Sequence, residues 1–190
     1  MTLLTGILSA FGLSASAGLN AYIPLLTVAL LARFTNLIEL SEPWNTLENG
    51  WVIGALSVLL VIEFFADKIP AVNHLNDLIH TFVRPAAGAI VFAASAGVIT
   101  DAQPAFSLIL GLLVAGGVHA VKALAVRPAV TATTGGVGNI PVSILEDILA
   151  TMLSILAIVI PVLFGVFAII ITAWLVWWLW RRSNPASAAT

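Results

Sequence analysis

Five apolar runs dominate the chain and are separated by short polar segments. They cover approximately residues 3–32, 51–66, 86–99, 105–126 and 144–180. The hydrocarbon core of a bilayer takes about 20 residues of α-helix, so each of the first four runs predicts one membrane span. The fifth run would be roughly 55 Å long as one helix, which exceeds a core of about 30 Å. Because Pro161 and Gly165 favour a break there, the pattern predicts an all-α bundle of about six transmembrane helices.

The few charged residues predict how these helices are oriented. If the chain begins on the inner side, six helices leave six basic residues on or near the inner face: Lys68, Arg84, Lys122, Arg127, Arg181 and Arg182. Arg33 would lie outside, at the start of an external loop that ends at Gly50. This distribution follows the positive-inside rule, whereas five helices would place the last two arginines outside. We therefore expect a multi-pass membrane protein with both termini in the cytoplasm.

The composition supports a bilayer environment and excludes several classes of protein. Hydrophobic residues make up 61% of the 190 residues and charged residues 8%, with a mean hydropathy of +1.11. A water-exposed surface normally has about a quarter of charged residues. The net charge of −2 argues against a nucleic-acid partner, and the absence of cysteine excludes disulfides and thiolate metal sites. We expect one transmembrane domain over residues 1–182 and a short disordered tail at 183–190.

The third apolar run, AAGAIVFAASAGVI, is short and consists almost entirely of small residues. Small side chains let helix backbones approach closely, so this helix is expected inside the bundle. Gly50 with Gly54, and Ala93 with Gly97, have the small-xxx-small spacing of such contacts.

Polar residues gather in one segment, FFADKIPAVNHLNDLIHTFVRP, at residues 64–85. Pro70 suits the first turn of a helix, and Pro85 is expected to end it. Between them, Asn73, Asp77, His80 and Arg84 recur at helical spacing and share one face. The segment is therefore predicted to be an amphipathic helix at the inner surface or dipping into the bundle.

Two interpretations of this polar face remain open. It can be a wet connector at the membrane surface, or Asp67, Asp77, His80 and Arg84 can turn inward as part of a polar pocket. Glu63 favours the second interpretation because it lies four residues before Asp67. The two carboxylates would share a helix face and repel each other without a proton or cation between them.

Several motifs together resemble a known family. They are GLSASAGLNAYIPLL, DKIPAVNHLNDLIHTFVRPAAGA, HAVKALAVRPAV and NIPVSILED. The chain resembles, from about Leu4 to Leu163, the bacterial membrane-protein family called domain of unknown function 4126. The resemblance implies a multi-span bacterial membrane protein, and it implies no activity or catalytic residue. We separately expect the protein in the inner (plasma) membrane.

Two segments interrupt the apolar sequence with polar residues, glycine and proline. GLSASAGLNAYIP lies within the first run, and RPAVTATTGGVGNIPVS precedes the fifth. Ala15-Ser16-Ala17 has the form of a signal-peptidase site, but apolar sequence resumes at Leu19, so we expect a first transmembrane helix. VRPAAGA and VRPAVTA suggest two similar re-entrant hairpins and an internal repeat, although chance matching also explains such short motifs. Paired broken helices are typical of transporter sites.

Ionisable residues within the later apolar runs also admit two interpretations. His119 and Lys122 must face protein or water, because a charge at a helix centre costs about 2.5–3.5 kcal/mol on insertion scales. Ser143 with Glu146 forms a predicted capping box, and Glu146 and Asp147 then stabilise a helix start or couple a proton or cation. The sequence has no H-E-x-x-H, no G-x-S-x-G and no recognisable metal-ligand spacing. An enzymatic activity is therefore left undecided, and no metal or cofactor is assigned.

The leading functional hypothesis is a transporter or permease for a small polar or anionic solute, coupled to protons or cations. The candidate binding residues are Asn20, Tyr22, Glu63, Asp67, Asp77, His80, Arg84, His119, Lys122, Arg127, Thr133, Asn139 and Asp147. Amides and hydroxyls would contact the solute, basic residues would attract an anionic group, and carboxylates or His119 would carry the proton or cation. The alternatives are a membrane enzyme or carrier for lipid phosphates at the inner interface, and an assembly protein without ligand. A homo-oligomer is compatible with each hypothesis.

Overall fold

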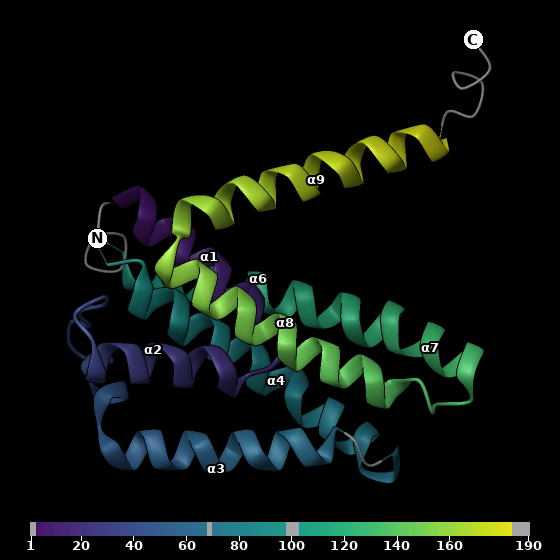
Figure 1. Ribbon diagram of the computed structural model, residues 1–190, viewed down its shortest axis with the longest axis horizontal. Helices are drawn as coiled ribbons and strands as arrows, with labels where there is room; N and C mark the ends of the chain where they lie inside the picture. Colours follow the sequence, from purple (N-terminus) through teal and green to yellow (C-terminus); the bar gives the residue numbers. More distant parts are fainter. Residues whose placement is uncertain (1–2, 68–69, 98–102, 184–190) are drawn as a thin grey trace.

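The computed structural model describes residues 3–67, 70–97 and 103–183, with the backbone alone for residues 70–77 and some positions of the last helix. These residues form a helical bundle without strands (Figure 1). Its elements are α1 Leu3–Leu19, α2 Tyr22–Phe34, η1 Trp44–Glu48, α3 Gly50–Ala66, α4 Pro70–Ser95, α6 Pro104–Val121, η2 Lys122–Val126, α7 Arg127–Thr134, α8 Asn139–Val159 and α9 Pro161–Ser183. The predicted all-α class is confirmed.

Three stretches of the described residues are long and apolar enough to cross a membrane. They are Leu78–Ser95, Pro104–Thr134 and Asn139–Val159. The helices α1, α2 and α3 are apolar but shorter. The apolar helices thus indicate a membrane protein, while the number of six spans stays a prediction.

The first apolar run forms two helices, so the prediction of one span from residue 3 to residue 32 is wrong. α1 ends at Leu19, and α2 runs back from the centre of the bundle toward the side where α1 begins (Figure 1). The break has a local cause, because Asn20 Oδ1 accepts the amide N–H groups of Tyr22 and Ile23, each at 3.1 Å. An asparagine that caps a new helix start competes with continuation of the old helix.

The helix that contains the polar segment continues through Pro85, contrary to the prediction that it ends there. α4 extends to Ser95, and its second half carries the buried residues Val91, Phe92 and Ala93. The buried position of the small-residue run is as predicted. Its packing inside the bundle outweighs the backbone hydrogen bond that proline removes, so the helix is not interrupted.

A close contact between α4 and α6 involves glycines outside the two predicted small-xxx-small pairs. A Cβ on Gly88 would lie against Ala115 Cβ and 2.9 Å from the carbonyl oxygen of Gly111, so α4 and α6 touch through their backbones there. A Cβ on Gly54 would meet nothing within 4 Å, and Gly97 has a φ of +45° just beyond α4. The predicted small-xxx-small contacts at these two glycines are therefore wrong.

The predicted re-entrant hairpin after VRPAVTA is also wrong. α6, η2 and α7 form one continuous helical stretch from Pro104 to Thr134. It ends at Gly135, whose φ of +63° suits glycine at a helix end. The predicted break at Pro161 is confirmed, since α8 ends at Val159 and α9 begins at Pro161.

Candidate functional site

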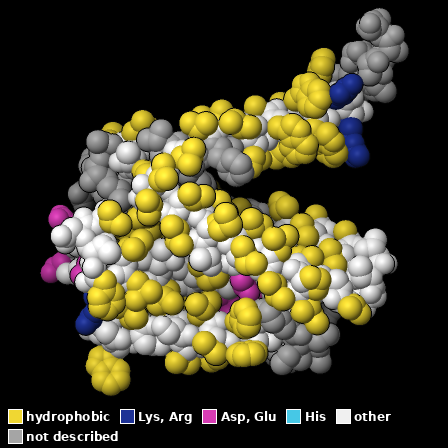
Figure 2. Space-filling view, viewed as in Figure 1, with side chains coloured by type: hydrophobic (Ala, Val, Ile, Leu, Met, Phe, Trp, Pro, Cys, Tyr) yellow, Lys and Arg dark blue, Asp and Glu magenta, His cyan; other side chains and the backbone are white. Residues whose placement is uncertain are grey.

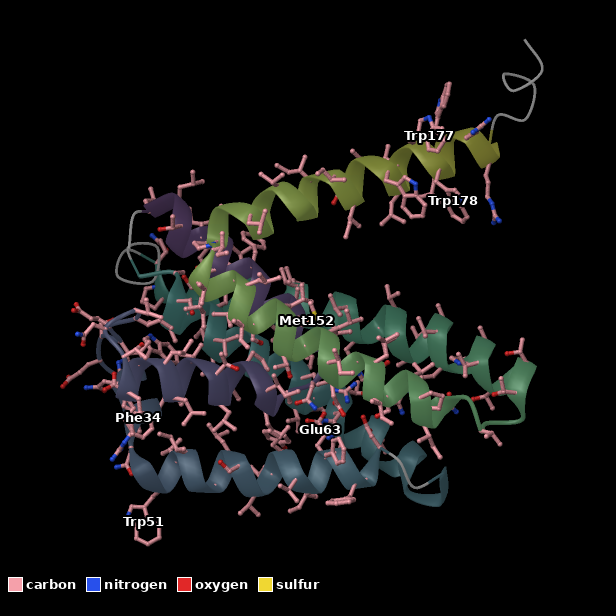
Figure 3. All side chains as sticks on the ribbon, in the orientation of Figure 1. Phe34, Trp51, Glu63, Met152, Trp177 and Trp178 are labelled. Carbon is pink, nitrogen blue, oxygen red and sulfur yellow. The ribbon has the colours of Figure 1, made fainter. Side chains whose placement is uncertain are left out.

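Eight ionisable side chains are buried together in the interior of the bundle. All are between 0% and 7% exposed: Glu63, Asp67, His80, Arg84, His119, Lys122, Arg127 and Glu146. They come from α3 and the residue after it, α4, α6, η2, α7 and α8. Side-chain nitrogen and oxygen atoms gather around Glu63 in the region between α3 and α8 (Figure 3). We call this set the charge network.

The cations and carboxylates of the charge network form a continuous series of contacts. Arg84 Nη2 donates to Glu63 Oε1 at 2.9 Å and lies 3.5 Å from Asp67 Oδ2. Arg127 Nη2 lies 3.2 Å from Asp67 Oδ2 and 3.5 Å from Glu146 Oε2. Lys122 Nζ pairs with Glu146 Oε2 at 2.7 Å and lies 4.0 Å from Asp67 Oδ2. Asp67 thus contacts all three cations, and the ionised groups balance as three against three.

The two histidines contact the same network from α4 and α6. His119 Nδ1 lies 3.2 Å from Arg84 Nη1, and its Nε2 lies 3.3 Å from Thr81 Oγ1. A guanidinium has no acceptor, so Nδ1 accepts from Arg84, and a neutral ring then carries its proton on Nε2. His80 Nδ1 lies 3.5 Å from Glu63 Oε1, and its ring meets Tyr22 edge-on at a centroid distance of 6.0 Å.

A π-helical turn explains why two cations five residues apart face the same site. At about 100° per residue, Lys122 and Arg127 would point roughly 140° apart in an α-helix. In η2 the N–H of Arg127 instead donates to the carbonyl of Lys122, which widens the turn and stacks the two residues. Pro128 follows directly and cannot donate to the carbonyl four residues earlier, which favours such an irregular turn.

The break between α1 and α2 is joined to the charge network. Lys122 Nζ donates to the carbonyl oxygen of Leu19 at 3.1 Å, at the negative end of α1. Asn20 caps α2 and also donates through Nδ2 to Asp147 Oδ1 at 3.0 Å, at the positive end of α2. Free backbone groups in a membrane interior need such partners. The two helix ends therefore receive a cation and an anion from η2 and α8.

The structure brings most of the predicted site residues together. Glu63, Asp67, His80, Arg84, His119, Lys122 and Arg127 belong to the charge network, and Asn20, Tyr22 and Asp147 border it. Asp67, His80 and Arg84 are buried, so the interpretation of a wet surface face does not hold for them. The side chain of Asp77 lies outside the described residues.

Two predicted solute contacts lie away from the network, near the turn between α7 and α8. Thr133 is exposed and donates to the carbonyl of Ala129, while Asn139 Nδ2 donates to Thr131 Oγ1 at 2.8 Å. Both residues belong to helix ends that α7 and α8 form there. The described contacts of Thr133 and Asn139 do not include Arg84 or Lys122, so a site shared with these cations stays a prediction.

Of the two interpretations of Glu146, the capping box is wrong, whereas coupling to a proton or cation stays a prediction. A capping box requires a helix that starts at Ser143, but α8 starts at Asn139. Ser143 and Glu146 therefore face the interior one to two turns into the helix, and Ser143 Oγ lies 3.5 Å from Asp67 Oδ2. A usable signal is the buried series Ser143, Glu146, Ala150, Ser154 and Ala157, which repeats at helical spacing.

Two apolar grooves flank α8, each with a volume of about 450 Å³. The first, the α3–α8 groove, is lined by residues that include Leu60, Phe64, Asp147, Ile148 and Met152. In Figure 2 an acidic side chain is visible among hydrophobic ones between α3 and α8.

The second groove, the α6–α8 groove, lies on the other side of α8. Its lining includes Val118, Val121, Leu149, Lys122 and Glu146. Because Lys122 and Glu146 belong to the charge network, this groove leads from the outer surface of the bundle to the network.

An all-helical bundle with apolar outer faces and a buried, balanced set of charges defines a membrane protein. Apolar side chains of α6, α8 and α9 such as Leu113, Leu145 and Ile169 are more than half exposed, as lipid-facing residues are. The chain belongs to the family described as Domain of unknown function (DUF4126), which matches residues 7–182. The family resemblance is thus confirmed over nearly the whole chain. No curated protein and no solved structure matches it.

Proposed function

We propose that this protein is a membrane transporter for an anionic ligand, coupled to proton movement. The observation that carries the proposal is the buried charge network. Removing one partner of a buried ion pair is strongly destabilising, yet apolar residues of similar volume often serve stability equally well or better. Ionisable residues inside a membrane protein are therefore most simply explained by a functional role.

The contacts within the network support an exchange of partners. Asp67 and Glu146 each contact two or three cations at distances from 2.7 to 4.0 Å. Among the described residues, Glu63 Oε2, His80 Nδ1 and Arg84 Nε are buried without a hydrogen-bond partner. Such atoms leave room for a water, a proton or a ligand group. An anion that binds the cations can replace a carboxylate if that carboxylate takes up a proton, because the total charge then stays unchanged.

The broken first segment supports transport rather than a purely structural network. Discontinuous helices at membrane depth expose backbone groups and dipole ends to a bound solute. Here Lys122 and Asp147 hold the two ends of the break, so a change in the pairing of Lys122 also affects the end of α1. Binding of a ligand to Lys122 can therefore change the position of α1 relative to α2.

Proteoliposomes test the proposal with several anionic probes. The probes are inorganic phosphate and glutamate, followed with a trapped pH indicator, and a fluorescent phosphatidic acid, followed by dithionite quenching. At least one probe should cross the membrane faster than in protein-free vesicles, and an inward proton gradient should increase this rate further. With Asp67→Asn the rate should fall to that of protein-free vesicles. Glu39→Gln, which changes an exposed carboxylate, is the matched control. If no probe moves faster than in empty vesicles, the proposal is wrong and an assembly role is favoured.

We further propose an orientation in the membrane that differs from the initial prediction for the N-terminus. In Figure 1, α1 and α3 begin at one end of the bundle, and α9 ends toward the other. With Arg181 and Arg182 on the cytoplasmic side, the return path of α2 moves the start of α1 to the outer side.

Single introduced cysteines test this orientation, because the sequence contains none. Leu4→Cys and Glu39→Cys should react with an impermeant maleimide on intact cells, and Arg182→Cys only after permeabilisation. Reaction of Leu4→Cys only after permeabilisation would instead support a cytoplasmic N-terminus.

A further inference from the structure

We infer that the ligand of the proposed transporter is an anionic amphiphile that enters from the bilayer through the α6–α8 groove. The inference rests on the proposed function, because it names the class of ligand and its route. It commits to a membrane-resident molecule with a phosphate or similar acidic head and one hydrocarbon chain in the groove.

The groove has the composition expected for a hydrocarbon chain. Its walls include Val118, Val121, Leu145 and Leu149, and it measures about 450 Å³, within the usual range of about 300–1,000 Å³ for small-molecule sites. Val121 is 63% and Leu145 54% exposed, so the mouth of the groove presents apolar side chains to its surroundings. In a bilayer these surroundings are lipid chains. A hydrophilic solute would have to pass through them, whereas an amphiphile already lies there.

The floor of the groove supplies the charge complementarity. Lys122 and Glu146 line it, with 2.7 Å between Nζ and Oε2, and Arg127 lies directly behind Glu146 at 3.5 Å. An acidic head that reaches Lys122 takes the position of the Glu146 carboxylate. Glu146 then takes up one proton, so a head that carries one negative charge leaves the net charge of the network unchanged, and its binding is coupled to that proton.

The α3–α8 groove has the same volume, but none of the described residues that line it is a cation. The ionisable residue in its lining is Asp147, a carboxylate that repels an acidic head. The two grooves are therefore distinguished by charge, while apolar side chains dominate both linings.

Neighbouring residues of α8 provide a matched pair of blocking variants. Leu149 lines the α6–α8 groove and is 41% exposed, while Ile148 lines the α3–α8 groove and is 50% exposed. A tryptophan at either position fills one groove without removing a charge. Leu149→Trp should block the amphiphile, and Ile148→Trp should leave its binding unchanged.

The experiment measures thermal stabilisation of the full chain in dodecyl maltoside, with dodecyl phosphate as the probe and inorganic phosphate as the free-anion arm. Dodecyl phosphate should stabilise the wild type with an apparent Kd at least tenfold below that of inorganic phosphate. Leu149→Trp and Lys122→Gln should each raise this Kd at least tenfold, and Ile148→Trp should not. Equal responses to the two probes, equal responses of the two tryptophan variants, or no stabilisation by dodecyl phosphate would each overturn the inference.

The outcomes separate this inference from the proposed function. If phosphate or glutamate is transported while dodecyl phosphate does not bind, the proposed transport function is supported and the inference of an amphiphilic ligand is wrong. If dodecyl phosphate binds as described while no probe crosses the vesicle membrane, the amphiphile site in the α6–α8 groove is supported and the proposed transport function is wrong.

Discussion

Two neighbouring layers of the same helices are held together by different physical means. In one layer, α4 and α6 touch through backbone at Gly88 and Gly111. About one helical turn from Gly88 along α4, and about two turns from Gly111 along α6, Arg84 meets His119 within the charge network. The first layer is determined by shape and the second by charge, although both are buried in the same bundle.

The comparison shows what each layer can tolerate. The glycine layer has no space for an added atom, and its buried Ser14 hydroxyl already donates to the carbonyl oxygen of Gly111 at 2.7 Å. The charged layer is balanced only as a whole, because each cation contacts at least one carboxylate and Asp67 contacts three cations. Adding atoms should damage the first layer, and removing single charges should damage the second.

The largest effect is expected from Asp67→Asn, which keeps the size of the side chain and leaves three cations with two carboxylates. Loss of one partner of a buried pair costs about 3–5 kcal/mol. We expect a loss of this order in the free energy of unfolding in detergent micelles. Glu39→Gln is the control and should change it by less than about 0.5 kcal/mol. A similar small change for both variants would show that the charged layer does not depend on its balance.

An intermediate effect is expected from Gly88→Ala in the glycine layer. The added methyl group would press on Ala115 and the backbone of Gly111, and overpacking of this kind costs about 1–3 kcal/mol. Gly54→Ala adds the same atom where a Cβ meets nothing within 4 Å, so it should be neutral or slightly stabilising. Equal stability of the two variants in micelles would contradict the close approach of α4 and α6.

The smallest effect is expected from Ser16→Ala, which tests hydrogen bonds between helices that belong to neither layer. Ser16 Oγ lies 2.8 Å from the carbonyl oxygen of Ala150 and from Ser154 Oγ, so α1 is linked to α8. Loss of the Ser16 hydroxyl should lower the free energy of unfolding in micelles by about 1 kcal/mol. Ser57→Ala removes a bond within α3 only, to the carbonyl of Ile53, and should cost less. A larger loss for Ser57→Ala would be inconsistent with the described packing of α1 against α8.

Much of the fold, and the involvement of several residues of the site, could be predicted from the sequence. The break at Pro161 and the burial of the small-residue run depend on local propensity and composition, which sequence reports directly. For His80 and Arg84 the sequence left a wet face and an inward position open, and the spacing of Glu63 and Asp67 favoured the inward position in which these residues are buried. These are effects of single residues or single helices.

The remainder depends on contacts between segments that are far apart in the chain. The α1–α2 break begins with the local cap of Asn20, but the partners of its two ends, Lys122 and Asp147, lie more than a hundred residues later. Helix continuation through Pro85 is decided by tertiary burial, and the role of Glu146 depends on where α8 begins. The π turn at Lys122 changes which residues share a face, and helical periodicity cannot anticipate it.

A double-mutant cycle between Asp67→Asn and Arg127→Gln tests most directly the claim that the charge network is balanced as a unit. The free energy of unfolding in micelles is measured for the wild type, both single variants and the double variant. We predict that the double variant is more stable than Asp67→Asn alone, with a coupling of at least about 1 kcal/mol, because the charges balance again. Losses that add within about 0.5 kcal/mol would contradict the claim.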